Sequence, residues 1–233
     1  MENSTAFIKL KQRLNKLDSN DYDNIQCWQF VEAFNKAQIE WCRRNLHGGN
    51  MYKEGDELSK KRIDDLQPLL IEYPLQGTVT TDYFESNNFP VDSYLEFKRV
   101  TSKAKDDCCD ARSMTVYLAE EANVPLIMRD PLKNPSFDWG ETFCTMLNNT
   151  IRIYKKDFDI VSPILTYYRK PTLIQVKGCQ NPYTGIESTE TINSEFKDDL
   201  VEVILDDTAA IIAGDIENIY QQQRETQAAE RNN

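Results

Sequence analysis

Residues 142–154 read TFCTMLNNTIRIY, and this stretch decides the fold of the middle of the chain. Two runs rich in β-branched and aromatic residues, 142–147 and 150–154, flank Asn148 and Asn149. Asparagine tolerates the positive φ that the central residues of a tight hairpin turn require. The pattern therefore predicts two antiparallel strands joined by a two-residue turn.

Further strand-like runs lie on both sides of this hairpin. They comprise residues 78–84, 94–100, 114–118 and 164–169, with residues 122–128 as one more candidate. Together they predict a small antiparallel β module over residues 78–177 rather than a βαβ array.

Helical spacing of apolar residues marks the two ends of the chain. A first helix is predicted over residues 7–17. A second is predicted over 22–46, with His47 near its end, where we expect the imidazole to complement the helix dipole. Its apolar stripe consists of Cys27, Phe30, Val31, Phe34, Ala37 and Trp41. Ser194 is expected to cap a last helix that starts near Glu195 and continues to Ile219.

These elements predict an α+β protein with N-terminal helices, a central antiparallel β module and a long C-terminal helix followed by a polar, extended tail. We expect an N-terminal helical segment at 1–77, the β module at 78–177, and the C-terminal helix with its docking tail at 178–233. The length of 233 residues fits one structural unit with extended arms.

The composition argues against two classes of protein. A mean hydropathy of −0.61, without an apolar run of about 18 residues, excludes an integral membrane protein. A net charge of −11 is opposite to what binding nucleic acid over the whole surface would need. Residues 1–14 lack the apolar core of a signal peptide, so we expect all six cysteines to be reduced thiols in the cytosol.

The sequence predicts no enzyme, and no catalytic, cofactor or metal site. It lacks a phosphate-binding glycine loop and a nucleophile elbow, and its one histidine leaves few options for a catalytic triad. Adjacent carboxylates are interpreted as solvated faces, because neighbouring residues on a helix do not face each other. They occur at Asp64-Asp65, Asp106-Asp107, Asp198-Asp199 and Asp206-Asp207.

Two pairs of basic residues follow predicted strands. Lys155 and Lys156 come after the hairpin, and Arg169 and Lys170 end the next strand. They are candidate contacts for an acidic partner or a DNA backbone. The alternative is protection of edge strands by charge.

Three stretches carry a resemblance to known proteins. They are FNKAQIEWCRRNLHG (34–48), TIRIY with ILTYYRKP (150–154 and 164–171), and ILDDTAAIIAGDIEN (204–218). Together they resemble virion structural proteins of crAss-like podophages. Within that group the resemblance is to a ring, or head-to-tail connector, protein.

The resemblance implies a cyclic homo-oligomer, a dodecamer, at the head-to-tail junction of the virion, assembled in the cytoplasm of the bacterial host. The implied partners are the portal protein and adjacent tail or ring proteins. Packaged DNA would pass through the channel without specific binding, and no cofactor or membrane is implied. The C-terminal helix and tail would dock on the portal or a neighbour. The candidate docking residues are Ile211, Ile212, Ile216, Ile219, Tyr220, Gln221, Gln222, Gln223 and Arg224.

Two alternatives stay open. One is an accessory virion protein, either receptor-binding or an assembly factor. The other is a carboxylate- or metal-dependent hydrolase, motivated by Asp106, Asp107 and Asp110 around the Cys108-Cys109 pair.

Overall fold

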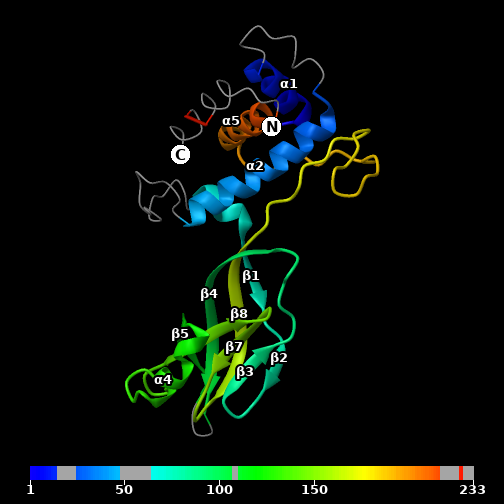
Figure 1. Cartoon of the computed structure of the whole chain (residues 1–233). Helices are drawn as coiled ribbons and strands as arrows, with labels where there is room; N and C mark the ends of the chain where they lie inside the picture. Colours follow the sequence, from blue (N-terminus) through cyan, green and yellow to red (C-terminus); the bar gives the residue numbers. More distant parts are fainter. Residues whose placement is uncertain (15–24, 48–63, 107–109, 216–225, 228–233) are drawn as a thin grey trace. The chain divides into compact units, whose positions relative to one another are not determined.

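The computed structural model describes residues 1–14, 25–47, 64–106, 110–215 and 226–227. The chain divides into two compact units (Figure 1). Unit 1 combines Met1–Pro68 with Pro171–Asn233, and unit 2 is the stretch between them, Leu69–Lys170. We expected one structural unit with its β module at 78–177, whereas unit 2 begins and ends earlier than that range.

The described residues of unit 1 form three long helices: α1 (Asn3–Leu14), α2 (Cys27–His47) and α5 (Asp198–Asp215). The predicted apolar stripe of α2 is confirmed from its second turn onward, because its side chains are buried. These residues are Phe30, Val31, Phe34, Ala37 and Trp41. A stripe at this spacing gives the helix one apolar face, and α2 packs against α5.

Helix α1 begins earlier than residue 7, where the apolar spacing placed its start. Asn3 is buried, and its Nδ2 donates hydrogen bonds to the backbone oxygens of Gln175 (2.9 Å) and Ile192 (2.7 Å). These bonds fix the first turn of the helix to the segment that precedes α5. Ile8, which lies within the predicted helix, is exposed.

Helix α5 begins at Asp198, a few residues after the predicted start near Glu195. Ser194 accepts a hydrogen bond from the backbone nitrogen of Phe196 (3.4 Å), so it stabilises a turn before the helix. Asp198 and Asp199 occupy the first turn, where negative charge complements the helix dipole.

Unit 2 contains one eight-stranded sheet in the order β1-β8-β4-β5-β6-β7-β3-β2. The strands are β1 (Leu70–Pro74), β2 (Gly77–Val79), β3 (Tyr83–Ser86), β4 (Tyr94–Lys105), β5 (Arg112–Leu118), β6 (Glu141–Leu147), β7 (Thr150–Tyr154) and β8 (Asp159–Arg169). Helices in unit 1 and a mostly antiparallel sheet in unit 2 confirm the α+β class.

Three expectations about the strands were wrong. Residues 122–128 are helical: a 3₁₀ turn, η4 (Glu121–Asn123), runs into the short helix α4 (Val124–Arg129). This helical stretch connects β5 to β6, which pair in parallel, so the sheet does contain one βαβ crossover. The expected strand at 78–84 is divided between β2 and β3.

The hairpin predicted from TFCTMLNNTIRIY is confirmed. Strands β6 and β7 pair antiparallel, with Leu147 opposite Thr150. Asn148 and Asn149 have φ values of 47° and 61°. Positive φ at both central residues matches the right-handed twist of the flanking strands.

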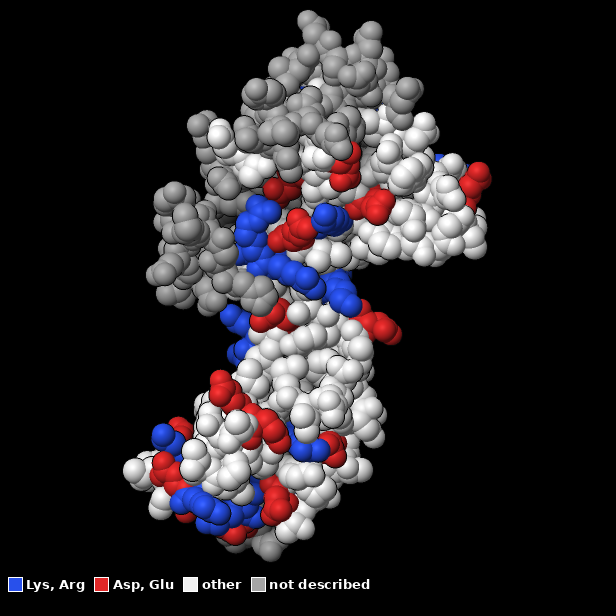
Figure 2. Space-filling model, viewed as in Figure 1, with Lys and Arg blue, Asp and Glu red and all other residues white. Residues whose placement is uncertain are grey.

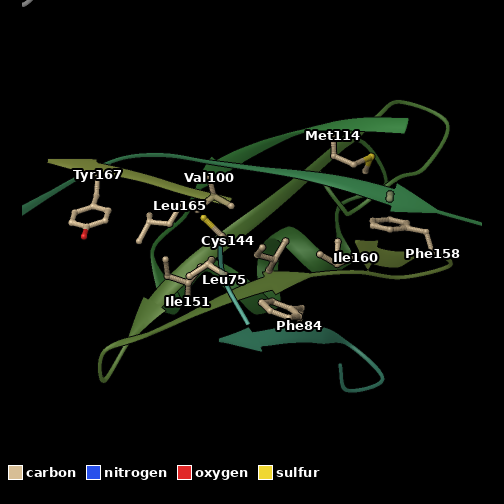
Figure 3. Packing of buried hydrophobic residues seen from close by; sticks show 12 residues of the cluster. Leu75, Phe84, Val100, Met114, Cys144, Ile151, Phe158, Ile160, Leu165 and Tyr167 are labelled. Atoms are coloured by element: carbon tan, nitrogen blue, oxygen red, sulfur yellow. The ribbon is translucent and has the colours of Figure 1, made fainter. Parts of the chain in front are cut away.

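The apolar core of unit 2 lies on the inner face of the sheet (Figure 3). Residues 75–76 alone connect β1 to β2, so the chain draws the two edge strands of the sheet toward each other. Side chains from six strands therefore meet in one interior. They include Phe84, Val100, Met114, Cys144, Ile151, Ile160 and Leu165.

Candidate interaction surfaces

Of the predicted docking residues in the C-terminal helix, the structure describes only two. Ile212 is buried in unit 1, so its side chain serves the packing of that unit. Ile211 is half-buried. The other seven, residues 216, 219 and 220–224, lie outside the described residues.

The four predicted basic contacts do not form one site. Lys155 and Lys156 precede β8, whereas Arg169 and Lys170 lie at its far end, roughly 30 Å away at the rise of a β-strand. Lys155 forms an ion pair with Asp159 (2.7 Å). Lys170 donates from Nζ to the backbone oxygen of Asp92 (3.0 Å). These bases take part in contacts of unit 2, which weakens the interpretation of a single basic surface.

We had interpreted the adjacent carboxylates as solvated faces. In α5 the exposed Asp198-Asp199 pair is consistent with that interpretation, whereas the Asp206-Asp207 pair is not. Arg13 on α1 forms an ion pair with Asp206 (2.6 Å) and with Glu202 (2.6 Å), and it therefore connects α1 to α5. Lys197 likewise forms an ion pair with Asp64. In Figure 2 basic and acidic side chains lie next to one another on the drawn face.

Asp207 is the more deeply buried carboxylate of the Asp206-Asp207 pair. Its Oδ1 lies 3.4 Å from Arg44 of α2, while Oδ2 is buried without a hydrogen-bond partner among the described residues. Burial raises the pKa of Asp207 to about 6, an increase that the nearby Arg44 only partly offsets. The group joins two helices of unit 1.

The expectation of six reduced cysteines was wrong for two of them. Cys27 and Cys179 form a disulfide, with a Cα–Cα distance of 6.0 Å. Cys42 and Cys144 are buried free thiols, and burial raises the pKa of each to about 12. They are therefore protonated and unreactive near neutral pH. Cys108 and Cys109 lie outside the described residues.

Two negative findings concern other classes of site. Among the described residues, no three His, Cys, Asp or Glu side chains come together as ligands for a metal ion. Asp106 and Asp110 are described, but Asp107 between them is not. No helix in the described part of the chain combines the length and apolar character needed to cross a bilayer.

A surface that the sequence analysis did not predict lies around α4. An open pocket of about 680 Å³, here named the α4 pocket, is formed by β5, η4, α4 and the start of β6. In Figure 1 α4 lies beside β5. Its apolar residues are Leu118, Leu126, Ile127 and Leu132, and its acidic residues are Glu120, Asp130 and Glu141. Lys133 is the one basic residue among those that line it.

Tyr117 connects the α4 pocket to the sheet. Met114 and Val116 of β5 point into the core, so Tyr117 points to the outer face. Its hydroxyl donates to the backbone oxygen of Lys133 (3.0 Å), which holds the segment after α4 against the strand. Burial raises the pKa of Tyr117, with smaller contributions from Glu141 and Asp130, so the neutral phenol remains the donor at neutral pH.

A row of aromatic rings crosses the outer face of the sheet. Tyr117 lies 5.8 Å from Phe143, Phe143 stacks on Tyr154 at 4.5 Å, and Tyr154 lies 5.7 Å from Tyr83. Phe143 and Tyr154 are buried, so this row is a second apolar layer. Of these four rings, Tyr117 also lines the α4 pocket.

The loop between α4 and β6 is held in place by Arg112. Its guanidinium donates to the backbone oxygen of Asp138 (2.6 Å) and lies over the ring of Phe137 at 4.8 Å. Gly140 has a φ of +69°, and a Cβ there would meet Arg112 Nη2 at 3.0 Å. The loop therefore has one defined conformation, which positions the side chains that it exposes.

This ordered region exposes large apolar side chains. Leu126 is 67% exposed, Leu132 85% and Trp139 78%. In the sequence Leu126 lies within the apolar run VPLIM, whereas Leu132 and Trp139 lie among Pro, Lys, Asp and Gly, a pattern typical of a surface loop. Only the crossover from β5 to β6, which was not predicted, brings Leu126 and Leu132 to one pocket.

A comparison with models of protein families and a comparison with curated proteins both gave no match. The function is therefore inferred from the sequence and from these surfaces.

Proposed function

We propose that this chain is a virion structural protein that forms an oligomeric ring in the head-to-tail connector of a crAss-like podophage, below the portal. The three resembling stretches motivate this assignment. In the proposed ring, unit 2 contacts neighbouring subunits, and the C-terminal residues dock on the portal protein or a neighbour. Packaged DNA passes through the channel without specific binding.

The observation that carries the proposal is the apolar surface around α4. Single exposed apolar residues are common on monomers, but here several gather at one pocket on an ordered element. Ordering is important because a preformed surface loses less conformational entropy when a partner binds than a surface that must first become ordered. A surface of this kind suits a protein whose exposed apolar side chains become buried when it assembles with other subunits.

Docking on the portal is proposed for the C-terminal residues that follow α5. Ile212 is already buried in unit 1, so the proposal places the contact on residues 216–224 together with the half-buried Ile211. Deleting residues 220–233 should abolish binding to the portal protein and leave the fold of both units unchanged. An accessory virion protein without a portal contact would not respond to this deletion.

Native mass spectrometry tests the ring. The purified chain is measured alone and after mixing with the portal protein of the same virus. We expect a closed multimer alone, or a stoichiometric complex with the portal protein, and its mass gives the symmetry. A chain that stays monomeric in both samples contradicts the proposed function.

A further inference from the structure

We propose that the α4 pocket of one subunit binds the outer face of strand β4 in a second copy of this chain, through Lys103 and Lys105. This inference rests on the proposed ring function and deepens it, because it names the two surfaces that meet.

The acceptor surface is the α4 pocket, whose lining is partly apolar and partly acidic. Leu126 and Leu132 supply the exposed apolar area. Three carboxylates and one lysine line it, so the pocket carries a net negative charge. Two of the carboxylates, Glu120 and Glu141, are exposed. A partner for this pocket needs an apolar centre and basic groups.

The complementary surface lies on the outer face of β4. Val100 and Ala104 point into the core, so Lys103 and Lys105 point outward, and both are exposed. Val161 of β8 stands opposite Lys103 in the register and is partly exposed. The lysine stems and Val161 provide the apolar area, and the two ammonium groups provide the charge.

The acidic residue closest in register does not cancel this charge. Asp159 stands opposite Lys105, but it forms an ion pair with Lys155 (2.7 Å). Among the described residues neither Lys103 nor Lys105 takes part in an ion pair. Both ammonium groups are therefore available to carboxylates of another subunit.

The two surfaces differ, so a contact between them joins unlike faces of two subunits. Such a contact can repeat head to tail, and where the rotation between subunits closes it gives a ring. Apolar burial supplies most of the affinity, while charge complementarity fixes the register and speeds association. This is the arrangement that a cyclic homo-oligomer needs.

The test uses two charge-reversed variants of the full chain. The pocket variant carries Glu120→Lys and Glu141→Lys, and the strand variant carries Lys103→Glu and Lys105→Glu. All four side chains are exposed, so both variants should fold. Matched controls reverse exposed charges outside both surfaces: Glu187→Lys with Glu190→Lys, and Lys36→Glu with Lys177→Glu.

Each variant alone should self-associate at least about tenfold more weakly than the wild type, because like charges then face each other. A one-to-one mixture of the two variants should restore the multimer. In that mixture one type of contact is native and the other has both charges reversed. The two controls should assemble like the wild type. The readout is native mass spectrometry, with far-UV circular dichroism to confirm folding.

Three other outcomes overturn the inference, and they are distinguishable. If the wild type and both variants form the multimer equally well, the proposed ring is still supported, but these two surfaces do not form its subunit contacts. If only the pocket variant fails, and mixing does not rescue it, the pocket binds something other than β4. If the wild type does not assemble alone or with the portal protein, the proposed function itself is contradicted.

Discussion

Asn35 binds both backbone polar groups of one residue, Ile174. Its Oδ1 accepts a hydrogen bond from the Ile174 nitrogen (2.8 Å), and its Nδ2 donates to the Ile174 oxygen (3.3 Å). Both residues are fully buried in unit 1. Helix α2 thus holds the chain where it re-enters unit 1 after the sheet.

Asn35→Ala should destabilise unit 1. The substitution leaves a buried N–H and a buried C=O of Ile174 without these partners, which lowers the free energy of unfolding by about 2–4 kcal/mol. Urea unfolding followed by helical ellipticity measures the change. Gln180→Ala, which removes an exposed hydrogen bond to Gly185, is the control and should cost less than about 1 kcal/mol. Equal effects of the two substitutions would contradict the role of Asn35.

Ionisation of the Asp207 carboxyl should lower the free energy of unfolding of unit 1 as pH rises. Its pKa in the folded state is raised to about 6, so the folded protein holds this proton more tightly than the unfolded chain does. The free energy of unfolding should therefore fall by up to about 3 kcal/mol between pH of about 4 and about 6.5 through this group. Asp207→Asn should abolish that fall.

Urea unfolding at pH of about 4.5 and about 7 checks this difference between wild type and variant. The control is Asp199→Asn, an exposed position on the same helix, which should keep the pH dependence of the wild type. An unchanged pH dependence in Asp207→Asn would show that ionisation of this carboxyl is not what changes stability.

The turn between β6 and β7 should respond to the residue type at position 149. Asn149 has a φ of 61°, which glycine adopts freely and a β-branched residue resists. Asn149→Gly should raise the free energy of unfolding of unit 2 by a few tenths of a kcal/mol, and Asn149→Val should lower it by about 1–2 kcal/mol. Thermal unfolding of the two variants compares them directly. The opposite order would mean that the turn has another conformation.

Arg112→Ala should loosen the loop before β6 without unfolding the sheet. The backbone amides of Ser136, Gly140 and Glu141 are hydrogen-bonded within this loop, and Arg112 holds it through Asp138 and Phe137. We expect these amides to exchange at least about tenfold faster in hydrogen–deuterium exchange. Arg129→Ala, an exposed arginine at the end of α4, is the control and should leave them protected.

The sequence predicted the elements with long or locally determined patterns. Helix α2 has several turns of regular apolar spacing. The turn at Asn148-Asn149 is predicted by the residue type itself, because asparagine tolerates positive φ. By contrast, the run VPLIM at 124–128 is too short for its periodicity to separate a strand from a buried helix. In the structure this run lies in α4. The α4 pocket could not be predicted, since it depends on that crossover. Strand β1 was missed because its short run, LIEYP, ends in proline.

The path of the chain through the two units also determines how the molecule bears tension. The chain enters unit 2 on β1 and leaves it on the neighbouring strand β8, where Leu70 pairs with Tyr168. The sheet therefore forms a loop that is inserted between the two segments of unit 1. The Cys27–Cys179 bond closes that loop covalently. A pull on the two ends is transmitted across this sulfur bridge and does not reach the strands. When the bond is reduced, the same pull loads β1 and β8, whose hydrogen bonds then separate one at a time.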